Sequence, residues 1–134
     1  ARILHLGAPG IHQRMDEPYE SDANGWVTVL RRARAAGLRT NLEMISGSPD
    51  EIRRLVLPCL PHLDSLIIND YEAGVLTGID VVTAGVTSAG AARRAAVALL
   101  VSGPLGDHGT TVLLARELFQ LHIRNACKQR YSPQ

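Results

Sequence analysis

The residues best suited to chemistry in this chain are Asn69 and Glu72, an amide and a carboxylate three positions apart. They follow the apolar run of residues 66–68, which is typical of a buried strand, and a segment with helical character comes next. This spacing puts Asn69 on the last strand residue and Glu72 in the first helical turn. In a parallel α/β sheet, ligands bind at the carboxyl ends of the strands. The pair therefore predicts a place to hold a metal ion and a phosphate.

The same two residues also have a purely structural interpretation. Asparagine is a favoured N-cap, and a carboxylate in the first turn interacts favourably with the helix dipole. Magnesium, in turn, prefers hard oxygen ligands and keeps several waters, so one nearby carboxylate can be enough. The residues of this segment alone leave both interpretations open.

The elements that position this pair alternate along the chain. Apolar runs predict strands at residues 3–6, 39–45, 63–69 and 110–115, and helical periodicity predicts helices at 26–36, 49–57, 71–77 and 89–101. Ser48 is expected to cap the second helix, with Pro49 at its first position and Glu51 completing a capping box. Short connections predict βαβ units around a mainly parallel sheet, with helices on both faces. Residues 1–115 form the predicted α/β core, and 116–134 a C-terminal helix or tail.

Composition excludes several function classes. The 134-residue chain has a net charge of +1, which gives no electrostatic case for binding nucleic acid or an anionic membrane. No apolar run approaches the roughly 20 residues that cross a bilayer. Cys59 and Cys127 fit no zinc or redox spacing and are interpreted as reduced thiols of a cytoplasmic protein. The chain enters a strand pattern almost at its first residue, without an initiator methionine, so we expect a fragment of a longer parent.

Several motifs together resemble a known family. They are HLGAPG at residues 5–10, RAAG at 34–37, LPHLD at 60–64, and Asn69-Asp70-Tyr71-Glu72 followed by LTG at 76–78. In this order, over residues 3–114, they resemble the ribokinase-like (PfkB) carbohydrate kinases. The resemblance implies a Rossmann-like αβα sandwich that transfers the terminal phosphate of ATP to a sugar or sugar-like alcohol. It also implies that Asn69 and Glu72 help to hold Mg²⁺ and phosphate.

The departures from the family pattern bear on catalysis. Glu43 stands where the family tends to have an aspartate, and Ile45 where it has an asparagine. The family's catalytic Gly-Ala-Gly-Asp motif does not occur; residues 88–91 look faintly similar but carry no carboxylate. The family's N-terminal sugar contacts and lid are missing as well. No catalytic residue is therefore assigned, and we expect no turnover by this chain alone.

Two other functions remain open. One is a non-catalytic α/β module that binds a nucleotide, a metabolite or a partner. The other is an unrelated doubly wound domain such as half of a dehydrogenase. Pro9 disfavours the second, because it stands where the backbone would have to approach a pyrophosphate closely.

An exposed sheet edge or apolar face would favour self-association into a homo-oligomer.

The remaining polar candidates favour structural interpretations. His12 and Asp16 follow the first strand on the side of the sheet where Asn69 lies and could approach a ligand, but a solvated loop is the preferred interpretation. His5 is expected to be a core or edge histidine, and His62 a connector residue. The glycine-rich loop at 103–109 precedes a strand instead of opening a helix, so we interpret it as a plain connection.

Overall fold

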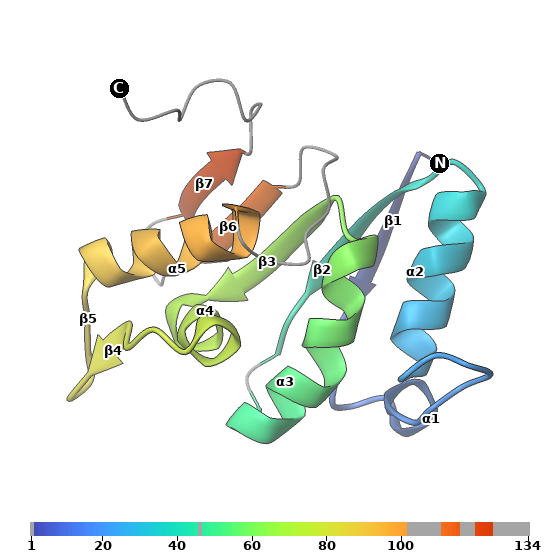
Figure 1. Ribbon diagram of the computed structural model, residues 1–134, viewed down its shortest axis with the longest axis horizontal. Coiled ribbons are helices and arrows are strands. Elements are labelled where there is room, and N and C mark those ends of the chain that lie inside the picture. The colour runs from blue at the N-terminus through green and yellow to red at the C-terminus, as the bar shows by residue number, and fades with distance from the viewer. Residues whose placement is uncertain (1, 46, 102–110, 116–119, 125–134) are drawn as a thin grey trace.

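The computed structural model describes residues 2–45, 47–101, 111–115 and 120–124, and these form an α/β fold around one five-stranded sheet (Figure 1). The strand order is β1-β2-β3-β6-β7. The first four strands are parallel, and β7 pairs antiparallel with β6. The strands are β1 (Ile3–Gly7), β2 (Arg39–Glu43), β3 (Ser65–Asn69), β6 (Thr111–Ala115) and β7 (Gln120–Arg124). The predicted mainly parallel, Rossmann-like α/β fold is confirmed.

The helices occupy the connections between these strands. They are α1 (Gln13–Asp16), α2 (Gly25–Ala35), α3 (Pro49–Val56), the 3-10 helix η1 (Leu57–His62), α4 (Asp70–Thr77) and α5 (Ala89–Val101). A short hairpin of β4 (Val82–Thr83) and β5 (Val86–Thr87) joins α4 to α5. Among the described residues, no helix is long and apolar enough to cross a membrane.

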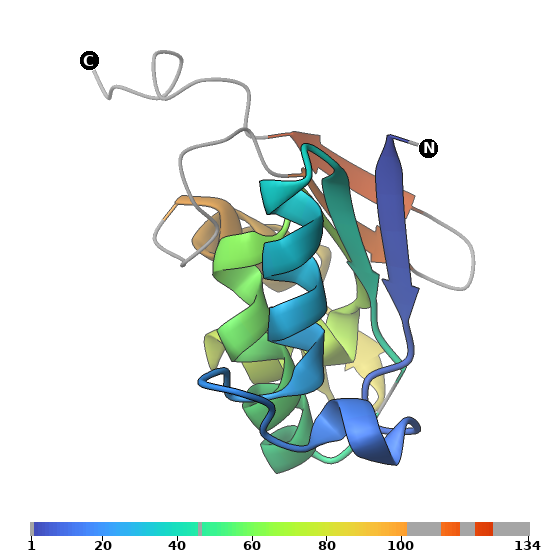
Figure 2. The same ribbon diagram turned by 90° about the vertical axis from the view of Figure 1, so that its right-hand side faces the viewer.

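The described crossover helices cover one face of the sheet, where the sequence predicted helices on both. Spatial order follows chain order from β1 to β6, so every right-handed crossover returns on the same side. Figure 2 shows α2 and α3 together on that side of the strands. Leu42, Leu66 and Ile68 point into the core beneath the helices. In the described part of the chain, the sandwich is therefore incomplete.

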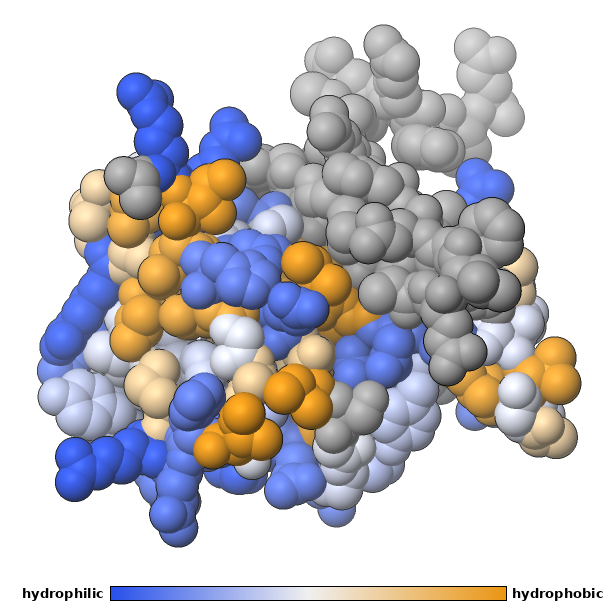
Figure 3. All heavy atoms as spheres, turned by 180° about the vertical axis from the view of Figure 1, so that it is seen from behind, coloured by the Kyte–Doolittle hydropathy of each residue, from blue (hydrophilic) through white to orange (hydrophobic). Residues whose placement is uncertain are grey.

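The face without described helices carries hydrophobic and hydrophilic residues side by side (Figure 3). Across it, the Ser65 hydroxyl donates to Asn41 Oδ1 at 2.6 Å, and the Asn41 amide lies 2.6 Å from His5 Nδ1. His5 Nε2 in turn lies 3.2 Å from a Glu43 carboxylate oxygen. This polar row links three strands. It places His5 on an edge strand, one of the two positions the sequence allowed.

The apolar run at residues 3–6 would suit a buried strand, but β1 is not buried. Among the described strands it is the terminal one of the sheet, and Ile3 is 62% exposed. An apolar run shows that a strand can be buried, but its depth depends on whether neighbours pair on both sides.

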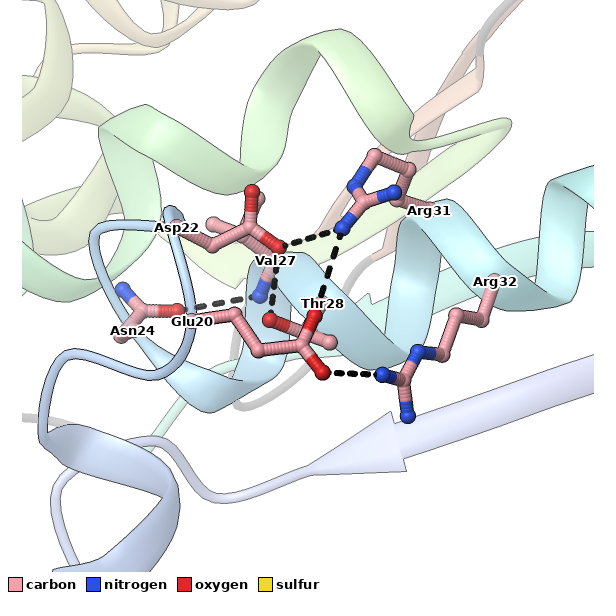
Figure 4. A network of polar contacts seen from close by, with 7 residues as sticks. All are labelled: Glu20, Asp22, Asn24, Val27, Thr28, Arg31 and Arg32. Carbon is pink, nitrogen blue, oxygen red and sulfur yellow. Dashed lines mark hydrogen bonds and ion pairs between the residues drawn. The ribbon is translucent and has the colours of Figure 1, made fainter.

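The loop before α2 is tied to that helix by a polar network (Figure 4). Asn24 caps the helix by accepting from the backbone N–H of Val27 at 3.0 Å. Asp22 accepts from Thr28 Oγ1 at 2.6 Å and from Arg31 at 3.0 Å. These bonds, led by the one from Thr28, lower the pKa of Asp22 below its ordinary value. Glu20 adds two ion pairs to this network, one with Arg31 and one with Arg32.

Local boundary signals were mostly confirmed, with two differences. Ser48 and Glu51 form the expected capping box on α3, and α4 ends at Gly78 in the left-handed conformation that glycine adopts most easily. Residues 79–88, for which the sequence predicted no helix or strand, include the β4–β5 hairpin. The helix considered after residue 115 is wrong for Gln120–Arg124, which pair as β7. The predicted loop at 103–109 and Cys127 lie outside the described residues.

Candidate functional site

The carboxyl ends of the parallel strands form an uneven edge. Gly7, Glu43 and Ile67 lie level with one another on β1, β2 and β3. Strand β3 continues two residues further to Asn69, which pairs with Ala115 of β6. Asn69 therefore projects beyond the ends of its neighbours β1 and β2, at the point where helix α4 begins.

Asn69 and Glu72 are locked together by reciprocal hydrogen bonds. Asn69 Oδ1 accepts from the backbone N–H of Glu72 at 2.8 Å, and Glu72 Oε2 accepts from the backbone N–H of Asn69 at 2.8 Å. The Asn69 amide also donates to Glu72 Oε1 at 3.0 Å. Glu72 is only 2% exposed. The structure thus brings the two predicted site residues into one rigid unit.

This unit is a capping box, so the structural role weighed from the sequence is present. A capping role does not exclude metal binding, because the same bonds fix the carboxylate orientation at the strand end. In the part of the chain that the structure describes, no group of three or more His, Cys, Asp or Glu side chains is arranged to hold a metal. A cation here would take a small share of its ligands from these residues and the rest from water and phosphate, which suits magnesium.

The residues between the pair connect α4 to its surroundings. Asp70 accepts hydrogen bonds from the hydroxyl of Thr87 in β5 and from the backbone N–H of Tyr71 at 3.1 Å. The Tyr71 hydroxyl reaches the carbonyl oxygen of Gly47 at 3.5 Å. The Thr87 contact could not be predicted from the sequence, because it depends on the β4–β5 hairpin, which the residue pattern does not indicate.

Asp16 lies in the interior of the molecule and not in a solvated loop, which corrects the preferred interpretation. It is 8% exposed, and its Oδ1 accepts from Trp26 Nε1 at 2.8 Å and from the backbone N–H of Gly10 at 3.0 Å. His12 packs beside Trp26 with ring centroids 5.7 Å apart. The physical reason is that the α2 indole needs an acceptor when buried. Asp16 therefore fixes the β1–α1 loop from within.

A shallow hollow of about 100 Å³ opens beside the ends of β1 and β2. The backbones of Gly10 and Gly47 and the Glu51 side chain line part of it. Its apolar lining comes from Pro9, Ile11, Met44, Ile45, Ile52 and Leu55. Ile45, which replaces the polar residue expected by the resemblance, is thus part of an apolar wall. Glu43 does not line this hollow and pairs instead with His5.

Burial shifts the pKa of two further residues, Cys59 and His62, in opposite directions. Burial raises the pKa of the Cys59 thiol to about 12, so it is protonated at neutral pH. Burial lowers the pKa of His62, chiefly by penalising its charged form. Both lie in η1, between α3 and β3, and the connector role expected for His62 fits this position.

Comparison with known proteins gives a fold and no family. No protein-family model matches the chain, and no curated protein matches it. Among solved structures, it is similar to the 2.06 Å crystal structure of phosphomethylpyrimidine kinase from Clostridium difficile 630, with a TM-score of 0.61 and 14% sequence identity. The match covers 94% of this chain and 50% of that one, so the chain spans half the length of the kinase. At this identity, the likeness establishes a shared fold only.

Proposed function

We propose that this chain is part of an ATP-dependent kinase that transfers a phosphoryl group to the hydroxyl of a small alcohol. The motif resemblance points to a sugar or sugar-like alcohol as the acceptor, whereas the structural neighbour is named for a phosphomethylpyrimidine. A small molecule that accepts phosphate is common to both. The observation that carries the proposal is the buried, interlocked Asn69–Glu72 pair at the carboxyl end of β3.

In this proposal, Glu72 and Asn69 help to hold a magnesium ion and the nucleotide phosphates. Bound magnesium would neutralise charge on the phosphates during transfer, and such transfer depends on positioning and electrostatic stabilisation more than on covalent help. The reciprocal bonds to Asn69 hold the Glu72 carboxylate in one orientation. A carboxylate oriented before the metal arrives loses little conformational entropy on binding it.

The proposal assigns no catalytic base to this chain. The Gly-Ala-Gly-Asp sequence of the resembled family does not occur in this chain. We therefore expect the chain to bind nucleotide without turning over. A steady-state phosphorylation assay with ATP, Mg²⁺ and a panel of alcohols tests this expectation, and clear turnover by the purified chain would refute it.

The binding proposal is tested by calorimetric titration of the chain with a non-hydrolysable ATP analogue, with Mg²⁺ or with excess EDTA. Glu72→Gln removes the negative charge but keeps a residue type that capping boxes accept. We expect it to weaken Mg²⁺-dependent binding by about 10-fold or more. Asn69→Ala should weaken it as well.

A matched control is available in the second capping box of the chain. Ser48→Ala removes the cap of α3, which has the same length as α4, and leaves the Asn69–Glu72 pair intact. It should not change nucleotide affinity. If Ser48→Ala and Asn69→Ala reduce nucleotide affinity equally, Asn69 has a capping role alone. If neither EDTA nor Glu72→Gln changes nucleotide affinity, the chain is better described as a nucleotide-binding module without a metal.

A further inference from the structure

We propose that Asn24 and Gly25 form a deamidation site, that the loop of residues 17–24 protects this site in the folded protein, and that conversion of Asn24 prevents the loop from closing again. The site lies where this loop meets the start of α2. Its chemistry involves only the chain itself and water, so it does not depend on the proposed kinase function.

An asparagine followed by a glycine is chemically vulnerable wherever the backbone is free to move. The main-chain nitrogen of Gly25 can attack Cγ of Asn24, which forms a cyclic succinimide. The bond from Cγ to the side-chain nitrogen breaks, and that nitrogen leaves as ammonia with the proton of the Gly25 N–H. Water then opens the ring to aspartate or isoaspartate. Glycine has no side chain to hinder ring closure, and of the four asparagines in the chain only Asn24 precedes one.

In the folded protein, both reacting groups of the site are held in other bonds. Asn24 Oδ1 accepts from the N–H of Val27 at 3.0 Å (Figure 4), and Asn24 Nδ2 donates to the carbonyl oxygen of Leu55 at 3.0 Å. The attacking nitrogen is engaged as well, because the N–H of Gly25 donates to the carbonyl oxygen of Glu17 at 3.2 Å. Asn24 is only 1% exposed. Turning its amide toward the Gly25 nitrogen would break both amide bonds.

The fold also favours the two residue types that make the site vulnerable. A Cβ at position 25 would lie 3.2 Å from Cα and 3.3 Å from the carbonyl oxygen of Met15, so the backbone of α1 leaves little room for any residue but glycine. At position 24, one short amide caps α2 and donates to Leu55 at the same time. Packing therefore keeps a pair that is prone to react once it is exposed.

Conversion of Asn24 would remove part of what holds the loop closed. Aspartate can accept from the N–H of Val27 as asparagine does, but it has no N–H to donate to Leu55. It would also bring a buried negative charge up to the Leu55 carbonyl oxygen, which costs free energy. Isoaspartate routes the main chain through the former side chain and so removes the cap. Both products therefore favour the open loop.

The loop is the part of this region that can open most easily. Residues 17–21 and 23 are exposed, and polar bonds tie the loop to α2. One of them joins the hydroxyl of Thr28 to the Asp22 carboxylate at 2.6 Å. Segments with few buried apolar contacts open locally at a lower free energy than the whole chain. We therefore expect opening of the loop, without unfolding of the core, to expose Asn24 and Gly25.

The test follows deamidation of each asparagine in the full chain by peptide mass spectrometry during incubation at mildly alkaline pH. In guanidinium chloride, Asn24 should react well ahead of Asn41, because the side chain of Leu42 hinders ring closure at Asn41. In the native protein at the same pH, we expect the Asn24 rate to be lower by about 100-fold or more.

Two threonine variants test the role of the loop. Thr28→Val removes the hydroxyl that donates to Asp22 and keeps the side-chain shape, so native deamidation of Asn24 should become about 10-fold faster. Thr40→Val is the matched control, because Thr40 is also buried and its hydroxyl donates to Asp64 at 3.1 Å, but it lies in β2. It should leave the deamidation rate unchanged.

Two variants of Asn24 test whether the converted loop can close. Asn24→Asp reproduces one product, and Asn24→Ser keeps a capping oxygen without a charge. Hydrogen exchange at the Gly25 N–H measures loop opening, because that group donates to Glu17 when the loop is closed. Asn24→Asp should speed this exchange by about 10-fold, and by more than Asn24→Ser does.

Three results would overturn the proposal. Equal rates of Asn24 deamidation in the native and the unfolded chain would show that the fold gives no protection. Equal native rates in Thr28→Val and Thr40→Val would remove the role of the loop. Exchange at Gly25 that is as slow in Asn24→Asp as in the unmodified chain would show that the converted loop closes normally.

Discussion

Replacing Asp16 by alanine tests whether this residue holds the β1–α1 loop in place. In the native structure, a single carboxylate oxygen accepts from Trp26 Nε1 and from the N–H of Gly10. Both bonds are lost in Asp16→Ala, and the indole N–H is left inside the core, where Trp26 is almost fully buried. A buried donor without a partner costs about 1–3 kcal/mol. For the two donors together we expect a loss of about 3–5 kcal/mol, a large part of a small domain's stability.

The asparagine variant separates charge from geometry. Asp16→Asn keeps an oxygen where both donors point, so only the charge-assisted part of the bonds is lost, and we expect a cost of about 1 kcal/mol. The assay is urea unfolding followed by tryptophan fluorescence, because Trp26 is the single tryptophan of the chain and contacts Asp16 directly. A loss below about 1 kcal/mol in Asp16→Ala, or equal losses in both variants, would refute this account.

Three further outcomes are expected. Gly74→Ala should destabilise the chain, because the new Cβ would lie 2.9 Å from a backbone carbonyl oxygen, although alanine favours helices over glycine by about 1 kcal/mol. Gly90→Ala should stabilise the chain, because its Cβ would lie 3.6 Å from the nearest atom. Urea unfolding measures both variants. Cys59, with a pKa of about 12, should react with a thiol reagent at pH 8 only after unfolding, in a variant lacking the other cysteine; rapid native reaction would contradict its burial. The pKa of Asp22 is lowered chiefly by the hydrogen bond from Thr28, so its stabilising effect is present above the unfolded pKa and is lost as pH falls through the lower folded pKa. Asp22→Asn should therefore reduce the loss of folding stability on acidification. An unchanged pH dependence of stability in this variant would contradict the assignment.

The two capping boxes show what the sequence could predict at the candidate site. Ser48 with Glu51, and Asn69 with Glu72, are pairs three residues apart whose bonds need only one turn of helix. Such geometry is set by neighbouring residues, so the approach of Asn69 to Glu72 could be predicted without coordinates. The burial of Glu72 could not, because it depends on the packing of α4 against the rest of the fold.

The hollow and its loop illustrate the opposite case. Gly10 and Asp16 are six residues apart and are joined to Trp26, ten residues beyond Asp16. Ile45, interpreted from the sequence as a departure from a polar pattern, becomes part of an apolar wall only when Ile11 and Leu55 are brought beside it. The periodicity of apolar residues along the chain does not predict these contacts between distant residues.

The sequence by itself determined the alternation of the longer strands and helices from β1 to β6 and the capping residues of α3 and α4, because hydrophobic periodicity and capping act over a few residues. Tertiary structure alone decided that β1 lies at the edge, that the described helices share one face, and that Asp16 is buried. These features depend on which strands pair and in what order, and pairing is governed by burial between segments far apart in the chain.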